Sequence, residues 1–333
     1  MKPGWILFLL AIVVLLMGTS VMAQEPHEVT VGVSWNQYDV SLVNAWETYM
    51  QSQAEEQGPA AGVEIEWIFN AADGDPARQA ANIEDLINQG VDLIVARAED
   101  GAAIGASIRA ANELGIPFIT FDRTSASTQP TAHVGGDSYL QGKDAAEALV
   151  ALLEDAGVTA QCIEMQGSLT DANAVNRSVA WGEVDAASDA FETVVQVPTE
   201  WDATLFLSGA TNALQAYPDA NCFFLASDFA INSVQSALES AGKWAPIGDP
   251  NHVWMATADL FPEAYTLMRD GYVDVSVTYD AFAHAQELVR VLIAVANGED
   301  PGCGEDGCLA QGRLATPENA ATLENLWARD FAG

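Results

Sequence analysis

The chain has 333 residues, half of them hydrophobic and 18% charged. This length suits about two domains, and the apolar fraction supports a packed core, which excludes disorder as the main state. Twelve Lys and Arg stand against 47 Asp and Glu, a formal net charge of -35 that argues against nucleic acid as a partner.

The first 23 residues resemble a secretory signal peptide in their pattern. Lys2 supplies a positive charge, residues 5–17 are all apolar, and Val21-Met22-Ala23 places small or apolar residues before a cleavage point. The apolar run is shorter than the roughly 20 residues that a membrane-spanning helix needs. We therefore expect cleavage after Ala23 and a mature chain that is periplasmic or extracellular.

From residue 29 onward, strand and helix signals alternate. Short apolar or β-branched runs predict strands at 29–35, 64–70, 93–96 and 118–122. One helix is expected to begin at Asp75-Pro76 and end at Gly90, and the next to begin at Asp100 and end at Gly115. This βαβ alternation predicts a parallel sheet with helices on both faces.

The same alternation restarts after a connector rich in Ser, Thr and Pro at residues 124–131. Strands are predicted at 161–166, 192–197, 222–227, 253–258 and 274–279, and a long helix at 281–297. Two sheets of about five strands each fit this better than one sheet of ten. The predicted fold class is α/β, with two similar doubly wound parallel-sheet lobes.

Polar and aromatic residues follow the predicted strands, at the edge where open α/β sheets bind ligands. Asp and Asn bridge vicinal hydroxyls, Arg donates in a fork, and ring faces cover C–H patches. Singly, these residues also suit ion pairs, core packing or helix caps. Their recurrence in both halves favours a site for a neutral polyhydroxylated ligand. The candidates are Asn36, Tyr38, Arg97, Asp122, Arg123, Asp171, Asn173, Arg177, Trp201, Asp228, Asp259 and Tyr279.

The sequence shows no catalytic signature. It has no Gly-x-Ser-x-Gly elbow, no phosphate-binding glycine loop and no His-Glu-x-x-His, and its four His are scattered. We therefore expect a non-enzymatic protein with no cofactor and no metal. Two carboxylates from different lobes could still form a glycosidase pair, so a secreted carbohydrate-active α/β enzyme remains the alternative.

Four segments resemble the periplasmic sugar-binding proteins of ABC importers, in the ribose, xylose and galactose group. The similarity extends from about Val29 to Asn297. It implies a monomeric receptor that captures a sugar or sugar-like polyol and delivers it to the membrane subunits of an ABC permease. A sugar receptor for a chemosensory protein or a kinase ectodomain would share the fold and stays open. The segments are Asn82–Val95, Gly115–Arg123, Gly135–Lys143 and Gly167–Ala174.

The resemblance also assigns roles to single residues. Asp122 and Arg123 would bind hydroxyls from the first lobe, and Arg177 and Asp259 from the second. Trp201 would stack on the sugar, and Tyr279 would line the hinge side. Asn36 and Tyr38 match the family loop only loosely. Arg97 and Ser227 depart from the family pattern, and Arg97 leaves an acidic sugar open.

The family architecture implies two lobes with the ligand in the cleft between them. Three hinge crossings are expected, near Gly136, near Tyr279-Asp280 and near Gln311–Arg313. The N-terminal lobe would comprise residues 24–136 plus 280–312, and the C-terminal lobe residues 137–279 plus 313–333.

Four cysteines allow three pairings, and export permits disulfides. Cys303 and Cys308 enclose four residues, two of them Gly, which suits a small disulfide loop better than a zinc site with its usual four ligands. Cys162 and Cys222 each begin a strand, and those strands are neighbours in the doubly wound order 2-1-3. Their Cα atoms should then lie about 5–6 Å apart. We predict the bridges Cys162–Cys222 and Cys303–Cys308.

Overall fold

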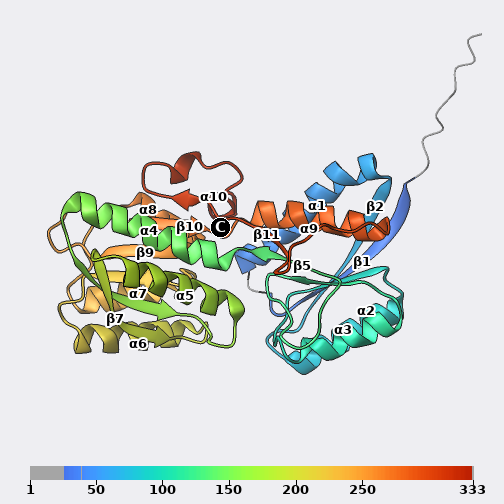
Figure 1. Cartoon of the computed structure of the whole chain (residues 1–333), viewed down its shortest axis with the longest axis horizontal. Helices are drawn as coiled ribbons and strands as arrows, with labels where there is room; N and C mark the ends of the chain where they lie inside the picture. The colour runs from blue at the N-terminus through green and yellow to red at the C-terminus, as the bar shows by residue number, and fades with distance from the viewer. Residues whose placement is uncertain (1–25, 39, 332–333) are drawn as a thin grey trace, which may run out of the picture.

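The computed structural model describes residues 26–38 and 40–331. The predicted signal peptide, residues 1–23, lies outside the described residues. Figure 1 shows two lobes side by side, joined through the middle of the molecule. Within the described ranges, no helix is both long enough and apolar enough to cross a membrane.

The first lobe is built on a six-stranded sheet in the order β11-β5-β4-β3-β1-β2, in which every pair is parallel. Helices α1 and α9 cover one face, and α2 and α3 cover the other. The strands are β1 (His27–Trp35), β2 (Val63–Ala71), β3 (Leu93–Ala96), β4 (Phe118–Phe121), β5 (Ala132–Gly136) and β11 (Cys308–Ala310). The helices are α1 (Val40–Ala61), α2 (Pro76–Gln89), α3 (Ile104–Glu113) and α9 (Ala281–Ala296).

The second lobe repeats this plan, with the order β12-β10-β9-β8-β6-β7. Only β12 is antiparallel to its neighbour among the described strands. Helices α4 and α5 pack on one face, and α6, α7 and α8 on the other. The strands are β6 (Ala160–Gln166), β7 (Phe191–Pro198), β8 (Cys222–Leu225), β9 (Trp254–Asp259), β10 (Val275–Thr278) and β12 (Leu314–Ala315). The helices are α4 (Ser138–Ala156), α5 (Ala172–Ala187), α6 (Ala203–Ala216), α7 (Ile231–Ser240) and α8 (Pro262–Arg269).

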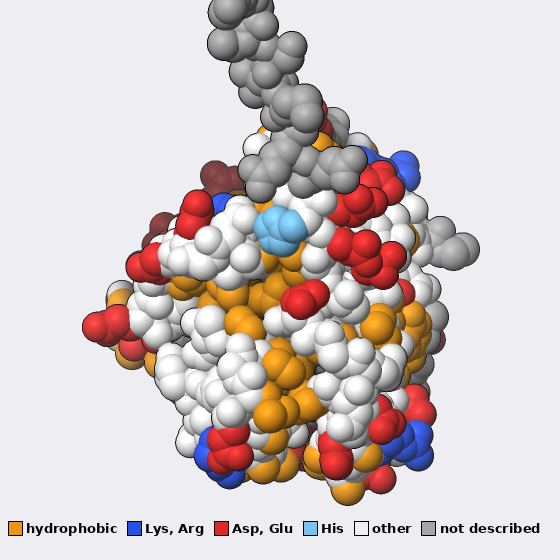
Figure 2. Space-filling model, turned by 90° about the vertical axis from the view of Figure 1, so that its right-hand side faces the viewer, with side chains coloured by type: hydrophobic (Ala, Val, Ile, Leu, Met, Phe, Trp, Pro, Cys, Tyr) orange, Lys and Arg blue, Asp and Glu red, His pale blue; other side chains and the backbone are white. Residues whose placement is uncertain are grey.

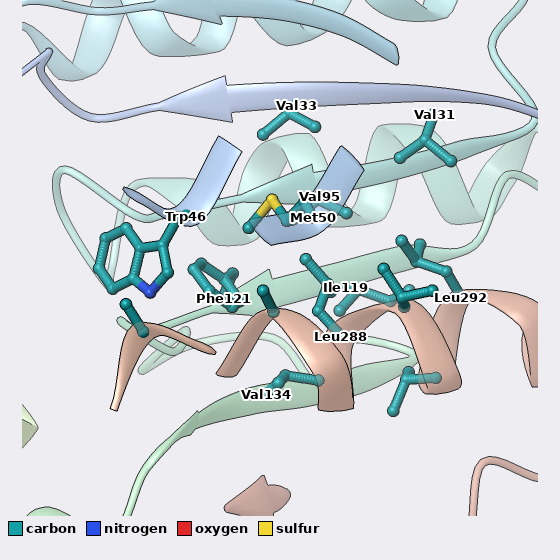
Figure 3. Close-up of a cluster of buried hydrophobic side chains, with 14 of the residues drawn as sticks. Val31, Val33, Trp46, Met50, Val95, Ile119, Phe121, Val134, Leu288 and Leu292 are labelled. Atoms are coloured by element: carbon teal, nitrogen blue, oxygen red, sulfur yellow. The ribbon is translucent and has the colours of Figure 1, made fainter. Parts of the chain in front are cut away.

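The packing of the first sheet explains how it holds the residues that follow its strands. Because side chains alternate along a strand, Val31 and Val33 of β1 share one face. Figure 3 shows them together with Phe121 of β4, packed against Trp46 of α1 and Leu288 of α9. All five side chains are fully buried. This cluster fixes the end of β4, and therefore the position of the residues just after it.

The chain passes between the two sheets at three places. It leaves the first sheet after β5 and enters α4, returns between β10 and α9, and crosses again between β11 and β12. The last segment, which follows β12, contains a short 3-10 helix, η1 (Ala320–Thr322), and a four-residue helix, α10 (Trp327–Asp330).

The predicted two-lobe α/β class is confirmed, and each strand that was predicted is present with its ends shifted by two residues or less. The expectation of about five strands per sheet was low by one, and β5, β11 and β12 were not among the predicted strands. Strands β11 and β12 are three and two residues long, which is too short to give an apolar pattern in the sequence.

Two further expectations need correction. Helix α3 does not begin at Asp100, because the Asp100 carboxylate accepts from the backbone N–H groups of Ala102 and Ala103 in a preceding turn, and the helix starts at Ile104. The C-terminal tail does not belong to the second lobe alone, since Trp327 is part of the buried cluster of the first lobe.

Both predicted disulfides are present, and the described residues contain no free cysteine. Cys162 and Cys222 are direct partners in the register of the adjacent strands β6 and β8. Their Cα atoms are 4.2 Å apart, closer than the expected 5–6 Å, because residues that face each other across neighbouring strands have about the inter-strand spacing.

The surface reflects the composition. Figure 2 looks at the end of the first lobe, where acidic side chains far outnumber basic ones and hydrophobic side chains form a strip down the middle. β2 is the edge strand of this sheet, and its Trp67 and Phe69 stack with ring centroids 5.8 Å apart, partly buried against the core.

Candidate functional site

A cavity of about 90 Å³ lies between the lobes, at the carboxyl ends of both sheets. Residues of both lobes and of the second crossing line it, so a molecule held there would contact both halves at once. The lining residues are Gln37, Leu42, Arg97, Asp122 and Arg123 from the first lobe, Asp171, Asn173, Arg177, Trp201, Ser227, Phe229, Asp259 and Phe261 from the second, and Tyr279 from the crossing.

Asp122, directly after β4, is the centre of the first-lobe wall. Its carboxylate accepts hydrogen bonds from Arg97 Nε and from the Tyr279 hydroxyl, and from Asn173 Nδ2 at 3.0 Å. Only 4% of Asp122 is exposed. Burial favours the neutral acid, but the charges of Arg97 and Arg123 outweigh it and hold the pKa of Asp122 well below its usual range. The carboxylate is therefore ionised at any pH of interest.

Arg97 and Arg123 flank this carboxylate. Arg97 also donates to Asn36 Oδ1 at 2.9 Å, and its guanidinium lies 5.5 Å from the centre of the Trp46 ring. Arg123 reaches across the cleft, with its Nε 3.4 Å from Asp171 Oδ2. Together with the bond from Asn173 to Asp122, this ion pair links the first lobe directly to the start of α5 in the second lobe.

Arg177, in the second turn of α5, organises the second-lobe wall. It donates at 2.7 Å to Gln141 Oε1, to the Ala226 carbonyl and to Asp259 Oδ1. Its guanidinium also lies 5.4 Å from the centre of the Tyr279 ring. Burial raises the pKa of Asp259 above its usual value even though the Arg177 charge acts in the opposite direction. Burial also raises the pKa of Tyr279, so its hydroxyl stays a donor to Asp122.

Aromatic rings form an apolar wall on the second-lobe side. The Trp201 indole N–H donates to Asp171 Oδ2 at 3.0 Å, which fixes the ring in the cleft. Phe229 meets Trp201 and Phe261 edge-to-face, with centroids 6.3 Å apart in each pair. The cavity lining therefore combines charged side chains with aromatic rings, as expected for a ligand with hydroxyls at its rim and C–H groups on its faces.

Backbone strain is concentrated here. Asp122, Trp201 and Asp259 have φ angles of 61°, 57° and 91°, in the left-handed region that residues other than Gly seldom adopt. Asp259 ends strand β9, Asp122 and Trp201 come after β4 and β7, and all three line the cavity. Such strain persists only where surrounding contacts enforce it, and it is common at functional sites.

The formal charges of the lining side chains cancel. Among the described residues that line the cavity there are three arginines and three aspartates, and each arginine is paired with one of the aspartates. The site can donate and accept many hydrogen bonds, but it offers no surplus positive charge to a carboxylate or a phosphate. Arg97, which left an acidic sugar open in the sequence, is neutralised by Asp122.

Nine of the twelve candidate residues line the cavity, and Asn36, Tyr38 and Asp228 do not. Asn36 is fully buried and accepts from Arg97, so it orients that guanidinium from behind. The Tyr38 side chain turns away because its hydroxyl donates to Glu47 of α1.

Asp228 points into the protein instead of the cleft. Its carboxylate accepts from the Thr257 hydroxyl at 2.6 Å and from the backbone N–H groups of Leu260 and Phe261 at 3.1 and 2.8 Å. Burial, with the nearby charge of Asp259, raises the pKa of Asp228 to about 8. Asp228 thus holds the turn that carries Asp259.

The candidate set left out five lining residues. Gln37 and Ser227 do follow strands, and they could have been found by including every polar residue there. Leu42, Phe229 and Phe261 are apolar and resemble core residues in the sequence, so nothing marked them. The five are Gln37, Leu42, Ser227, Phe229 and Phe261.

Two parallel-sheet lobes, three crossings and a polar cleft between the sheet ends define a two-lobe, hinged binding protein. Residues 40–300 match the periplasmic binding protein domain. The chain belongs to this family.

Similarities to known proteins in sequence and in structure support this assignment. The chain is 28% identical to the ribose import binding protein of Salmonella typhimurium, over 67% of this chain and 72% of that protein. It is 23% identical to the D-allose-binding periplasmic protein of Escherichia coli, over 71% of this chain and 76% of that protein. Among solved structures, a Bacillus halodurans ABC transporter solute binding protein with bound myo-inositol superimposes with a TM-score of 0.75 at 26% identity, covering 89% of this chain and 97% of that one.

Proposed function

We propose that this protein is an extracytoplasmic receptor that captures a neutral sugar or sugar-like polyol and delivers it to an ABC permease. The observation that carries the proposal is the cleft lining, in which the charges of three ion pairs cancel and aromatic rings lie among the polar side chains. The names of its relatives support the same class of ligand, because they include ribose- and D-allose-binding proteins and a structure with bound myo-inositol.

The ligand-contacting residues in this proposal are those that line the cavity. Ligand hydroxyls would accept from the guanidinium groups of Arg97, Arg123 and Arg177, and donate to the carboxylates of Asp122 and Asp259. Trp201 would cover one face of the ring. The remaining proposed contacts are Asp171, Asn173 and Tyr279. Asn36 and Asp228 would support the site without touching the ligand, and Tyr38 would take no part in binding.

Three finer features belong to the same proposal. The chain is secreted by cleavage after Ala23, it acts as a monomer, and it binds its ligand without chemical turnover. The carboxylates support binding without turnover, because Asp122 and Asp259 are each held by an arginine and neither is available as a free acid or nucleophile.

A thermal-shift screen tests the ligand class. The panel comprises D-ribose, D-xylose, D-allose, D-galactose, xylitol, myo-inositol and, as a charged comparison, D-glucuronate. A ligand that binds the native state stabilises it by about 2.7 kcal/mol when its concentration is 100 times Kd, and this raises the melting temperature. At least one neutral compound should do so, and D-glucuronate should not. A response to D-glucuronate alone, or product formation from a bound sugar seen by NMR, would contradict the proposal.

A further inference from the structure

The last segment of the chain, residues 316–331, lies across the junction of the lobes. Figure 1 shows it in dark red above the second lobe, with the C-terminus near the middle of the molecule. It follows β12 of the second lobe, and Ala320 of η1 is buried in the second-lobe core. A tail that only extended the second lobe would stay on that core, but this one continues into the first.

Three consecutive residues near its end alternate between the two cores. Leu326 and Ala328 are buried in the hydrophobic cluster of the second lobe, whereas Trp327 between them is buried in that of the first. None of the three is more than 1% exposed. The segment therefore joins the lobes through packing, in addition to the three covalent crossings.

Trp327 also contacts two residues of the ligand cleft from behind. Its indole N–H donates to the backbone carbonyl of Tyr279 at 2.8 Å, and its ring meets Phe261 edge-to-face with centroids 4.9 Å apart. Tyr279 lies on the second crossing and donates to Asp122 of the first lobe, while Phe261 belongs to the aromatic wall of the second lobe. One side chain outside the cavity thus supports both of its walls.

We infer that Trp327 is a positioning residue for the cleft, which favours the closed arrangement of the lobes by packing into the first-lobe core while its neighbours anchor in the second. Rotation of the lobes away from each other must pull Trp327 from one cluster or Leu326 and Ala328 from the other. The segment therefore opposes opening, and it raises the fraction of molecules that are ready to hold a ligand. Apparent affinity scales with that fraction.

Two matched substitutions test this inference. Trp327→Phe keeps a ring against Phe261 but removes the hydrogen bond to Tyr279. Trp181→Phe, the control, removes a comparable bond from the indole N–H to Thr193 Oγ1 at 2.9 Å, in a fully buried Trp that lies within the second lobe alone. Melting temperature, the radius of gyration of the ligand-free protein and ligand affinity are measured for both, and for Trp327→Ala.

The ligand-free radius of gyration should increase for Trp327→Phe and increase further for Trp327→Ala, and it should stay at the parent value for Trp181→Phe. With the tightest neutral compound of the panel, Kd should rise about 2- to 10-fold for Trp327→Phe, the equivalent of one hydrogen bond. If Trp327→Phe lowers the melting temperature as Trp181→Phe does but changes neither the radius nor Kd, Trp327 is only a core residue and the inference is wrong.

The affinity readout rests on the proposed function, but the radius of gyration does not. If no compound of the panel binds, the proposed ligand class fails while the ligand-free scattering still decides the role of Trp327. If Trp327→Ala does not fold, the decision rests on Trp327→Phe, whose smaller change leaves the core filled.

Discussion

Asp122→Asn should weaken both the fold and the binding site, because the carboxylate organises contacts already present without ligand. The change keeps the shape of the side chain but removes its charge and turns one oxygen into an N–H₂ group. If the N–H₂ group points toward Arg97, it meets the guanidinium N–H, which is also a donor. If it points toward Tyr279 and Asn173, it meets the amide N–H₂ of Asn173, again a donor. In either orientation at least one bond is lost and the buried guanidinium of Arg97 loses its counter-ion.

The structure sets the size of this effect. Breaking a buried ion pair by removing one partner costs about 3–5 kcal/mol. Asn36 still accepts from Arg97 after the change, so the lower end of that range, about 3 kcal/mol, is expected at pH 7. Because the folded-state pKa of Asp122 is lowered, this stabilisation is complete above the unfolded value of 3.8 and is lost as pH falls below it.

Urea unfolding of the parent and of Asp122→Asn measures the difference. The control is Asp75→Asn at the exposed start of α2, where the carboxylate accepts from the N–H groups of Ala77 and Arg78 and an amide oxygen can still accept. The control should lose only a few tenths of a kcal/mol and keep its affinity. An unfolding free energy for Asp122→Asn within about 0.5 kcal/mol of the parent would refute the reasoning, because breaking a buried network of hydrogen bonds and ion pairs is strongly destabilising.

Three further predictions concern stability. Burial alone would lower the pKa of His252, but its hydrogen bond to Asp274 raises that pKa above 6.5. The stability lost in His252→Gln should therefore be complete below pH 6.5 and should shrink as pH rises through the folded-state pKa. Urea unfolding from pH 6 to 9 measures this change. Replacing Cys162 and Cys222 together by Ala should cost about 4 kcal/mol, because that bridge closes a loop of 60 residues; a loss below 1 kcal/mol by denaturant unfolding would count against this. Raising NaCl from 0.1 to 1 M should raise the melting temperature, because salt screens the repulsion within a net charge of -35; a fall would contradict this.

Much of the fold could be predicted because it depends on local patterns. Strands such as β3 and β4 are short runs of mostly apolar residues, and the cap at Asp75 and the left-handed Gly90 mark the ends of α2. The strand order followed from the doubly wound rule, and it also placed Cys162 opposite Cys222. Strands β11 and β12 had no such signal, because each is only an edge pairing made by a chain segment on its way between the lobes.

The site could be predicted in position but not in detail. Strand ends identified Asp122, Arg177 and Asp259 because the edge of a parallel sheet is fixed by topology. The direction of a side chain beyond that edge depends on partners far away in sequence. Asp228 turns inward to the N–H groups after β9, and Phe261 turns toward the cleft because Trp327 supports it from behind.

Isothermal titration of the parent and of Arg177→Lys with the tightest neutral compound of the panel tests the central claim most directly. Lysine keeps the charge but cannot bond to Gln141, Ala226 and Asp259 in the same fork. The parent should bind one molecule per chain, and Arg177→Lys should bind at least tenfold more weakly, the equivalent of one charge-assisted hydrogen bond of about 1.5 kcal/mol. Equal affinity in the two proteins, or no heat of binding from any neutral sugar or polyol, would contradict the assignment of this cleft as the binding site.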